Sequence, residues 1–454
     1  MPGKLSFEEL RAAVEAGEID TVLVAQTDMQ GRLMGKRFHA EHFLRSAWEE
    51  THSCNYLMAL DMEMTPVPGY KSASWEAGYG DYTMRPDLGT LRRIPWLPGT
   101  ALVLADLEEH RAHAPVPMSP RAVLKRQIAR LEALGYLPLM ASELEFFLFR
   151  TSFEEAAAAG YRGLEPISAY NEDYHIFQTS KEEDVMRAIR LGLAGADIPV
   201  ENTKGEADAG QEEVNVTYAD ALTMADRHVI IKNAVKEIAW GRGRAVTFMA
   251  KWSSAHAGSS CHVHQSLVGR DGEPVFNDPE AEHGMSPLMR HYLAGLLAHA
   301  SEITWFLAPY VNSYKRFMAG TFAPTKAVWS VDNRTAGYRV VGEGTRAVRV
   351  ECRVGGADLN PYLAFAALLA AGIAGIESEL VLEPPFRGDA YGGAGREIPK
   401  TLRDAIAALD GSAMLRAAMG DEVVDHYVHC ARWEQLESDR RVTDWDLHRG
   451  FERG

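Results

Sequence analysis

Three segments of the chain alternate polar and apolar residues with a period of two, which predicts β-strands at residues 142–149, 260–267 and 347–354. Their polar faces carry Glu143 and Glu145, His262 and His264, and Arg349, Glu351 and Arg353. A half-buried strand normally turns its polar face to water. Acidic, imidazole and guanidinium faces on three separate strands indicate a shared internal cavity instead. Carboxylate-rich sites suit hard divalent cations such as Mg²⁺ or Mn²⁺, which in turn suit phosphates.

Hydrophobic periodicity and turn residues divide the rest of the chain into two parts. Ser6 and Glu9 match a capping box ahead of a short amphipathic helix that Gly17 ends. Proline-rich residues 114–120 indicate a boundary, which we place near residue 110. The other predicted elements are a hairpin at 21–26 and 32–38, a turn-rich stretch at 65–100, a buried strand at 101–107, a helix that Ser119 starts and Gly135 stops, and a buried helix at 361–376.

This division predicts two domains, residues 1–110 and residues 111–454. A chain of 454 residues is longer than chains that fold around a single hydrophobic core usually are. The second part mixes helices with antiparallel-looking strands rather than alternating strictly between strand and helix. That order favours an α+β fold.

The composition is that of an ordinary globular protein, with 46% hydrophobic and 24% charged residues. Lys and Arg total 47 against 63 Asp and Glu, and the net charge of −16 argues against nucleic acid or an anionic membrane as the main partner. The four cysteines are far apart and lack CxxC spacing, so a reducing cytoplasm fits better than a disulfide framework or a zinc site. We expect no signal segment and no membrane span, because no apolar run is long enough.

A series of ordered motifs extends along nearly the whole chain. They are TMRPDLGTLRRIPW at 83–96, SELEFF at 142–147, KGEADAGQEEV at 204–214, GSSCHVHQSL at 258–267, NSYKRF at 312–317, DNRTAGYR at 332–339, RVECR at 349–353 and NPYLAFAALL at 360–369. Together they resemble the glutamine synthetase family. The resemblance implies an amino-terminal β-grasp domain and a glutamine-synthetase/guanido-kinase-type catalytic domain with a curved antiparallel sheet. It also implies a homo-oligomer, a dodecamer of two hexameric rings with sites shared between neighbours.

Carried over residue by residue, the resemblance implies a site for two divalent cations, ATP and an amino acid. One cation would be held by Glu145, Glu206 and Glu213, and the other by Glu143, His262 and Glu351. The expected ATP contacts are His264, Arg339 and Arg349 beside the phosphates, and Tyr218 and Ser266 beside the nucleoside. The amino-acid substrate would contact Gly258, Arg316 and Arg353, and the transferring phosphoryl group Arg334. No Walker phosphate loop occurs in the sequence, so cations and arginines must hold the nucleotide.

Each of these pieces also has an ordinary structural interpretation. Glu143 and Glu145 alone are more often a solvated strand face, and His262 alone is more often a satisfied core or surface histidine. Glu206 alone would be a loop charge, and the arginines alone would form surface ion pairs. Only the ordered set favours a catalytic site.

Two positions depart from what the resemblance implies for ammonia-using members. Phe322 stands where a flap glutamate would close over the site and take a proton from ammonium, and Ala257 replaces a usual asparagine. A lost general base typically costs about 10²- to 10⁴-fold in rate. An aromatic ring offers apolar contact to an alkyl amine instead, worth about 0.8 kcal/mol per buried CH₂. The pattern favours an amine larger than ammonia, and the alternative is that Phe322 merely packs beneath the flap.

Three further stretches, at 27–38, 78–96 and 442–453, are similar to γ-glutamylethanolamide synthetases. The implied reaction joins the γ-carboxylate of L-glutamate to a primary amine, of which ethanolamine is favoured. It consumes ATP and proceeds through a γ-glutamyl phosphate intermediate. Asp61 and Asp81 are candidates for binding the amine substrate from across a subunit interface. The alternatives are a glutamine synthetase that uses ammonia, a γ-glutamylpolyamine or γ-glutamylmethylamide synthetase, and a catalytically silent relative.

Overall fold

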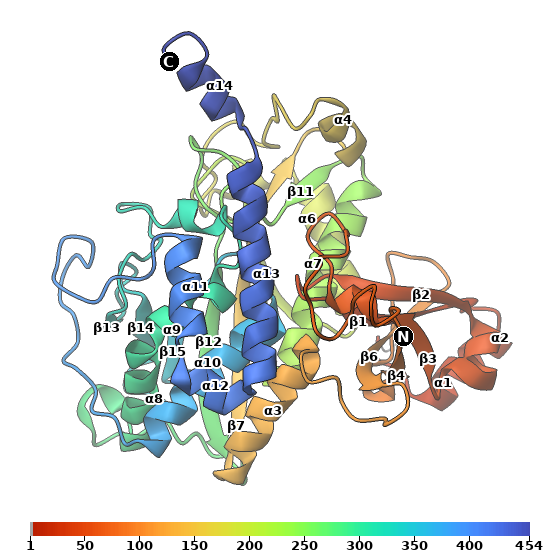
Figure 1. The fold of residues 1–454 in the computed structure, drawn as a ribbon, viewed down its shortest axis with the longest axis horizontal. Coiled ribbons are helices and arrows are strands. Elements are labelled where there is room, and N and C mark those ends of the chain that lie inside the picture. Colours follow the sequence, from red (N-terminus) through yellow and green to blue (C-terminus); the bar gives the residue numbers. More distant parts are fainter. Residues whose placement is uncertain (1–2) are drawn as a thin grey trace.

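The computed structural model describes residues 3–454, which form two β-sheets with helices around them (Figure 1). The strands of the amino-terminal sheet are β1 (Thr21–Thr27), β2 (Leu33–His39), β3 (Thr51–Cys54), β4 (Asp81–Pro86), β5 (Arg92–Arg93) and β6 (Thr100–Glu109). Their order is β2-β1-β6-β4-β3, with β5 paired to β6. β1 runs parallel to β6, and the other pairs are antiparallel.

Local sequence signals account for most of this first sheet. The predicted hairpin is confirmed, since β1 pairs with β2 from Thr21 opposite His39 to Thr27 opposite Leu33. Helix α1 (Phe7–Glu15) begins at the predicted capping box of Ser6. The stretch at 65–100, predicted to be rich in turns, also contains β4 and β5, which the sequence interpretation did not identify. β4 is short and ends at a proline, so it gave a weak strand signal.

The second sheet has nine strands and carries the polar faces predicted from the sequence. Its strands are β7 (Tyr136–Phe149), β8 (Val200–Gly205), β9 (Gln211–Val216), β10 (Ala219–Asp220), β11 (Ala245–Thr247), β12 (Cys261–Gly269), β13 (Trp329–Val331), β14 (Tyr338–Val341) and β15 (Arg349–Cys352). The order is β13-β14-β15-β12-β7-β9-β8, and β10 and β11 also pair with β7. β7 is therefore the centre of the sheet.

The helices that follow α1 are α2 (Ala40–His42), α3 (Pro120–Ala133), α4 (Phe153–Ala158), α5 (Ile176–Thr179), α6 (Glu183–Gly195), α7 (Ala221–Trp240), α8 (Pro287–Ala298), α9 (Ala300–Leu307), α10 (Pro361–Glu377), α11 (Leu402–Asp410), α12 (Ala413–Met419), α13 (Asp421–Arg440) and α14 (Asp444–Gly450). Some of them form the main core against the apolar side of β7. α3 and α7 pack against β7, and α10 packs against α3, α7, α8 and α9. The predicted buried helix is confirmed as α10, which is apolar all round.

A buried ion-pair network connects the two sheets through their helices. Arg121 of α3 donates to Asp226 of α7 and, across to the first sheet, to Asp87 and Asp106. Asn360 caps α10 and donates to two carbonyl groups of the β1–β2 turn. The predicted domain boundary near residue 110 falls between β6 and α3, and it stays a prediction.

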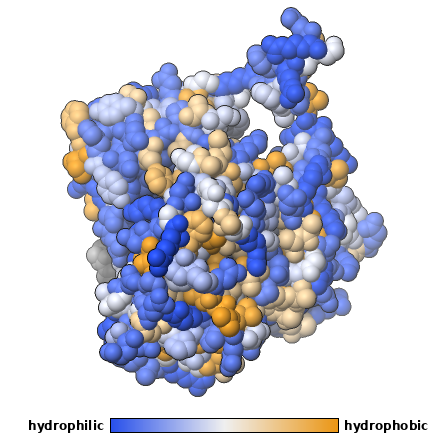
Figure 2. Space-filling model, turned by 90° about the vertical axis from the view of Figure 1, so that its left-hand side faces the viewer, coloured by the Kyte–Doolittle hydropathy of each residue, from blue (hydrophilic) through white to orange (hydrophobic). Residues whose placement is uncertain are grey.

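The carboxyl-terminal segment projects from the body of the molecule (Figures 1 and 2). Val442, Trp445, Leu447 and Phe451 of this segment are 74%, 64%, 52% and 84% exposed. Single exposed apolar residues are ordinary, but a projecting arm that carries several of them favours a partner surface. No helix among residues 3–454 combines the length and hydrophobicity needed to cross a bilayer. All four cysteines are free thiols.

Candidate active site

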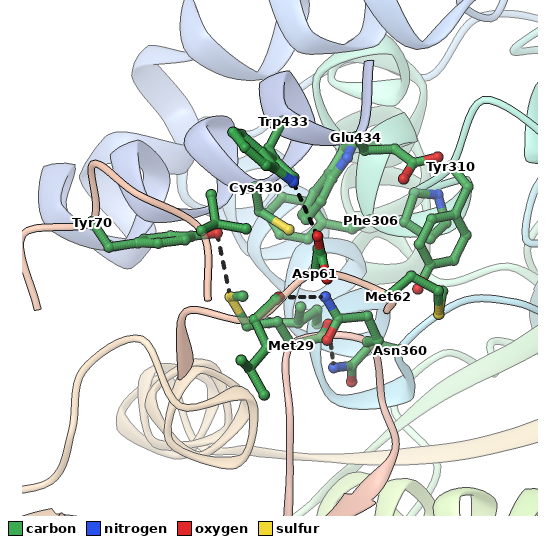
Figure 3. A pocket seen from close by; sticks show the side chains of 16 residues that line it. Met29, Asp61, Met62, Tyr70, Phe306, Tyr310, Asn360, Cys430, Trp433 and Glu434 are labelled. Atoms are coloured by element: carbon green, nitrogen blue, oxygen red, sulfur yellow. Dashed lines mark hydrogen bonds between the residues drawn. The ribbon is translucent and has the colours of Figure 1, made fainter. Parts of the chain in front are cut away.

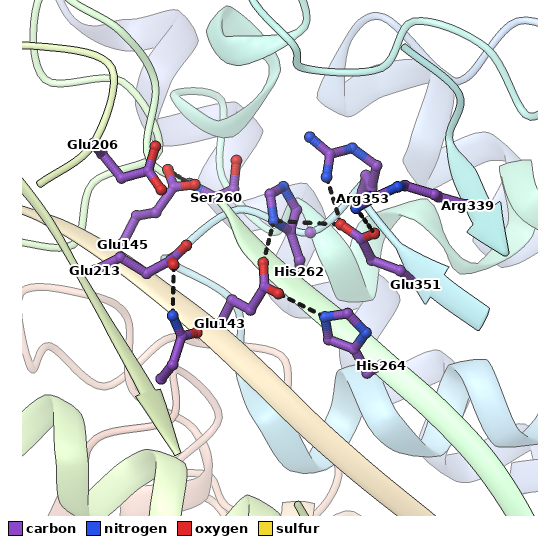
Figure 4. A network of polar contacts seen from close by, with 12 residues as sticks. Glu143, Glu145, Glu206, Glu213, Ser260, His262, His264, Arg339, Glu351 and Arg353 are labelled. Atoms are coloured by element: carbon purple, nitrogen blue, oxygen red, sulfur yellow. Dashed lines mark hydrogen bonds and ion pairs between the residues drawn. The ribbon is translucent and has the colours of Figure 1, made fainter. Parts of the chain in front are cut away.

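Strand register, rather than closeness in sequence, assembles the polar cluster shown in Figure 4. Glu145 of β7 is directly opposite Glu213 of β9, and Glu143 of β7 is directly opposite His262 of β12. Directly opposite residues in an antiparallel pair have Cβ atoms about 4.5–5.5 Å apart. Because β7 alternates with a period of two, its two glutamates share one face while Leu144 and Phe146 on the other face enter the core.

The first predicted cation set, Glu145, Glu206 and Glu213, is brought together by the structure. Ligand atoms from all three lie within 4.8 Å of one another. Glu206 lies just after β8 rather than on a strand, and it forms an ion pair with Lys204. One oxygen of Glu145 accepts a hydrogen bond from the Ser260 backbone N–H at 2.7 Å, which fixes its orientation.

The electrostatics of this set favour a bound cation. Burial, together with the charge of Glu206, raises the pKa of Glu145 to about 8. Burial and the charges of Glu206, Glu145 and Glu143 raise the pKa of Glu213 to about 9. Buried carboxylates that repel one another need compensating positive charge. An oxygen-rich set of this kind fits a hard divalent ion such as Mg²⁺ or Mn²⁺.

The second predicted set, Glu143, His262 and Glu351, is divided between two overlapping groups. Glu143 accepts from His262 Nδ1 at 2.9 Å through one oxygen and contacts His264 Nε2 at 2.8 Å through the other. The groups that could hold an ion are therefore Glu143 with His262 and Glu213, and Glu143 with His264 and Glu351. His262 Nδ1 is 3.7 Å from Glu351. The difference from the prediction arises because both imidazoles bind the same carboxylate.

The protonation states in this second region suit cation binding. Burial lowers the pKa of His262, and the charge of Arg353 lowers it further, which favours the neutral imidazole that binds metals. Burial opposes ionisation of Glu143, but hydrogen bonds from His262 and His264 outweigh it and hold the pKa of Glu143 below its ordinary value. Glu351 is nearly completely buried, and its pKa is lowered despite burial because His262 and Arg353 are close.

Arg339 of β14 and Arg353, which directly follows β15, converge on Glu351. Arg339 Nη1 donates to one oxygen of Glu351 at 2.8 Å, and Arg353 Nη1 pairs with the other. Arg349 Nε lies 3.2 Å from His264 Nδ1, on the same side. The predicted phosphate contacts therefore lie next to the predicted cation ligands, where their positive charge would act on a polyphosphate.

Arg316 occupies a closely packed position behind the cluster. It is 3% exposed, and it donates to Ser260 Oγ at 3.1 Å and to the Gly355 carbonyl at 2.9 Å. A Cβ atom on Gly258 would lie 2.4 Å from Arg316 Cγ and 2.8 Å from the Ala250 carbonyl. The Arg316 side chain can therefore occupy this position only because residue 258 has no side chain.

A cavity of about 690 Å³ opens beside the second group. Tyr218 and Ser266, predicted for the nucleoside, line it together with Glu143, His264 and Arg349. Its volume lies within the range of about 300–1,000 Å³ usual for small-molecule sites. The structure thus joins the expected nucleoside side to the expected phosphate and cation side.

Four predicted residues do not join this cluster within the chain. Arg334 and Asp81 are exposed, and Phe322 is 57% exposed with a left-handed φ of +57°. Asp61 lines a separate small pocket that α9, α10 and α13 also border, where it accepts from Trp433 Nε1 at 3.3 Å (Figure 3). Asp61 also accepts from the backbone N–H groups of its own turn. Any role of these residues in catalysis stays a prediction.

The sequence interpretation missed three residues that position the glutamates. Lys204 pairs with Glu206, Gln211 Nε2 donates to Glu145 at 3.1 Å, and Asn215 Nδ2 donates to Glu213 at 2.8 Å. Spacing in the sequence could have identified two of them, since Lys204 and Asn215 each lie two residues from the glutamate that they contact. Such positions share a strand face when the strand extends that far.

Comparison with known proteins places the chain in a family. The model of the glutamine synthetase catalytic domain matches residues 117–450. Over 450 residues the chain is 48% identical to the γ-glutamylethanolamide synthetase GlnA4 of Streptomyces coelicolor, covering 99% of this chain and 96% of that protein. It is 37% identical to a glutamate–isopropylamine ligase of a Pseudomonas species, covering 98% of each. A glutamine synthetase of Thermus thermophilus is also 37% identical, over 81% of this chain and 84% of its own.

Solved structures agree with this assignment. A structure described as apo GmaS without ligand superposes with a TM-score of 0.85 at 28% identity, covering 98% of this chain and 99% of that one. The chain belongs to the glutamine synthetase family, and it is an ATP-dependent ligase that forms carbon–nitrogen bonds. The predicted α+β fold class is thereby confirmed. Members of this family use divalent cations, bind ATP and glutamate, and are oligomeric.

Proposed function

We propose that this ligase joins the γ-carboxylate of L-glutamate to a primary amine, with ethanolamine as the favoured amine. ATP would phosphorylate the γ-carboxylate, and the amine would then displace phosphate from the γ-glutamyl phosphate to give the amide. The observation that carries the proposal is the register-paired cluster of Glu143, Glu145, Glu213 and His262 beside a nucleotide-sized cavity. The identity to ethanolamine and isopropylamine ligases supports the amine class.

The chemistry explains why the site needs this combination of groups. Attack of a carboxylate on ATP brings two anions together and spreads charge over the transferring phosphoryl oxygens. Two divalent ions, Mg²⁺ or Mn²⁺, when bound by the carboxylates and His262, would supply fixed positive charge there. Arg339 and Arg349 add guanidinium groups on the phosphate side, and buried Arg316 and Arg353 favour a carboxylate substrate. Arg334 would contact the phosphoryl group when the exposed segment that carries it closes.

Phe322 supports an alkyl amine over ammonia. Its ring is exposed in the flap and carries neither the charge that holds ammonium nor a base to deprotonate it. Closure of the flap would place an apolar surface against the methylene groups of ethanolamine. Asp81, which is exposed, and Asp61 would then bind the polar end of the amine from a neighbouring subunit.

We also propose that the chain assembles as a dodecamer of two hexameric rings in the cytoplasm. The projecting arm with exposed Trp445 and Phe451 supports contact with another copy. Four free thiols support a reducing compartment.

The test is a comparison of amines with the purified protein, ATP, L-glutamate and Mg²⁺. Phosphate release and the mass of the adduct would be measured with ethanolamine, methylamine, isopropylamine, putrescine and ammonium. We expect ethanolamine to give the highest kcat/KM and ammonium a value lower by about 10²-fold or more. Equal or faster turnover with ammonium would contradict the amine assignment. The Glu143→Gln variant serves as control, since it should lose turnover with every amine.

A further inference from the structure

A third group of acidic residues lies outside the site described above. Glu172 belongs to the loop before α5, Glu182 is the N-cap residue of α6, and Glu212 lies on β9. The three side chains are 0%, 1% and 1% exposed, and a ligand atom from each lies within 4.8 Å of the others. No step of the proposed reaction uses them.

The carboxylate oxygens of this group lack partners. Both oxygens of Glu172, both of Glu182 and one of Glu212 are buried without a hydrogen bond from any of residues 3–454. An unpaired buried carboxylate is among the least favourable groups in a protein interior. Five such oxygen atoms in one place need a common explanation.

The lysine side chains near this group form contacts with other residues. Lys204, whose charge acts on Glu212, is bound to Glu206 and lies 3.4 Å from Asp173. Lys181 donates to the side-chain oxygen of Gln178 at 2.7 Å. The lysines of this region therefore leave the three glutamates without a counter-ion.

The surroundings of the group are closely packed rather than open. A Cβ atom on Gly205, which pairs with Glu212 across β8 and β9, would lie 2.5 Å from the Glu172 carbonyl oxygen and 2.7 Å from Glu172 Cγ. Because Gly205 has no side chain, the loop that carries Glu172 can approach strands β8 and β9. Glu172 therefore lies next to Glu212. This is a formed site with its ligand atoms already converged.

We propose that Glu172, Glu182 and Glu212 bind a further divalent cation, of the hard class that prefers oxygen ligands, such as Mg²⁺, Mn²⁺ or Ca²⁺. The cation replaces the missing counter-charge and cross-links the loop before α5, the start of α6 and strand β9. Glu212 and Glu213 are adjacent on β9 and face opposite sides of the sheet. The cation therefore anchors, from behind, the strand that carries the active-site residue Glu213.

The competing explanation is that the carboxyl groups share protons. Burial and the charge of Glu182 raise the pKa of Glu172 to about 8. In that case the group stays neutral near pH 7 and binds no cation. The two explanations differ in what they predict for cation density and for the number of cations bound.

The direct test uses Mn²⁺ as the probe and crystals of the full chain, with anomalous diffraction measured at the manganese edge. We expect a peak within about 2.6 Å of oxygens from at least two of the three glutamates. Absence of a peak there would overturn the proposal. This measurement needs no variant, so it does not depend on the folding of an altered protein.

A second measurement counts bound Mn²⁺ by equilibrium dialysis at pH 7.5. The Glu172→Gln/Glu182→Gln double variant should bind one equivalent of Mn²⁺ fewer per chain than the parent. The Glu165→Gln variant, which removes an exposed acid from the same loop, should bind the same number as the parent. An unchanged count in a folded double variant would support shared protons and overturn the proposal.

Discussion

Glu145 and Glu213 lie directly opposite each other on β7 and β9, 6% and 4% exposed, and among residues 3–454 neither forms an ion pair with a basic side chain. Their hydrogen-bond donors are neutral: a backbone N–H, a glutamine and an asparagine. Such a pair destabilises the fold when both groups ionise. A divalent cation, as proposed above, would supply the missing positive charge.

The first prediction concerns pH. The folded-state pKa values of Glu145 and Glu213, about 8 and about 9, lie above the ordinary value of 4.5. The folded, cation-free protein therefore binds more protons than the unfolded chain between about pH 4.5 and 9, so its stability should fall as pH rises through that range. Thermal unfolding in EDTA across pH 5–9 measures this trend, and added Mg²⁺ should raise the Tm most at the alkaline end. A Tm in EDTA that rises steadily over the same range would contradict the account.

Glu213→Gln should separate stability from activity. The amide keeps the shape of the side chain and removes its charge, so the cation-free protein should become more stable at pH 8. Turnover should fall at least about 10²-fold, because one cation ligand is lost. Unfolding in EDTA and phosphate release measure the two effects on the same sample. Glu165→Gln should change neither, and a Glu213→Gln variant that kept full activity would remove Glu213 from the site.

Alternation along the strands predicted which side chains share a face, and this is why Glu143, Glu145, His262 and Glu351 could be identified together. Register was not predictable, because it depends on pairing between strands more than a hundred residues apart. The family resemblance grouped His262 with Glu143 and Glu351; in the structure, ligand atoms of His264 also converge with those of Glu143 and Glu351, and the histidine ligand of the cation stays a prediction. The buried group at Glu172 was also missed, since a loop glutamate carries no periodic signal.

Phe322→Glu should change the choice of amine. A flap carboxylate restores charge that can hold ammonium and accept a proton, and it removes apolar contact with an alkyl amine. We expect the ratio of kcat/KM for ammonium to that for ethanolamine to rise by about 10-fold or more. Phe322→Leu is the matched control, because it keeps an apolar side chain and should keep the preference of the parent. An unchanged ratio in the glutamate variant would mean that Phe322 only packs in the flap.

Gly258→Ala should disturb the amino-acid side of the site. The added methyl group would lie 2.4 Å from Arg316 Cγ, so the buried arginine or the backbone must move. Overpacking of this kind costs about 1–3 kcal/mol. We expect the KM for glutamate to rise more than the KM for ATP, measured in steady state. Equal changes in both constants would indicate general destabilisation rather than displacement of Arg316.

The most direct test of the central claim follows an oxygen atom. When the amine opens a γ-glutamyl phosphate, one oxygen of the glutamate γ-carboxylate leaves with the phosphate. With L-glutamate labelled by ¹⁸O in that carboxylate, ATP and ethanolamine, mass spectrometry of the released phosphate should show one labelled oxygen per molecule. Unlabelled phosphate would show that water, and not the γ-carboxylate, attacks ATP, and would contradict the account.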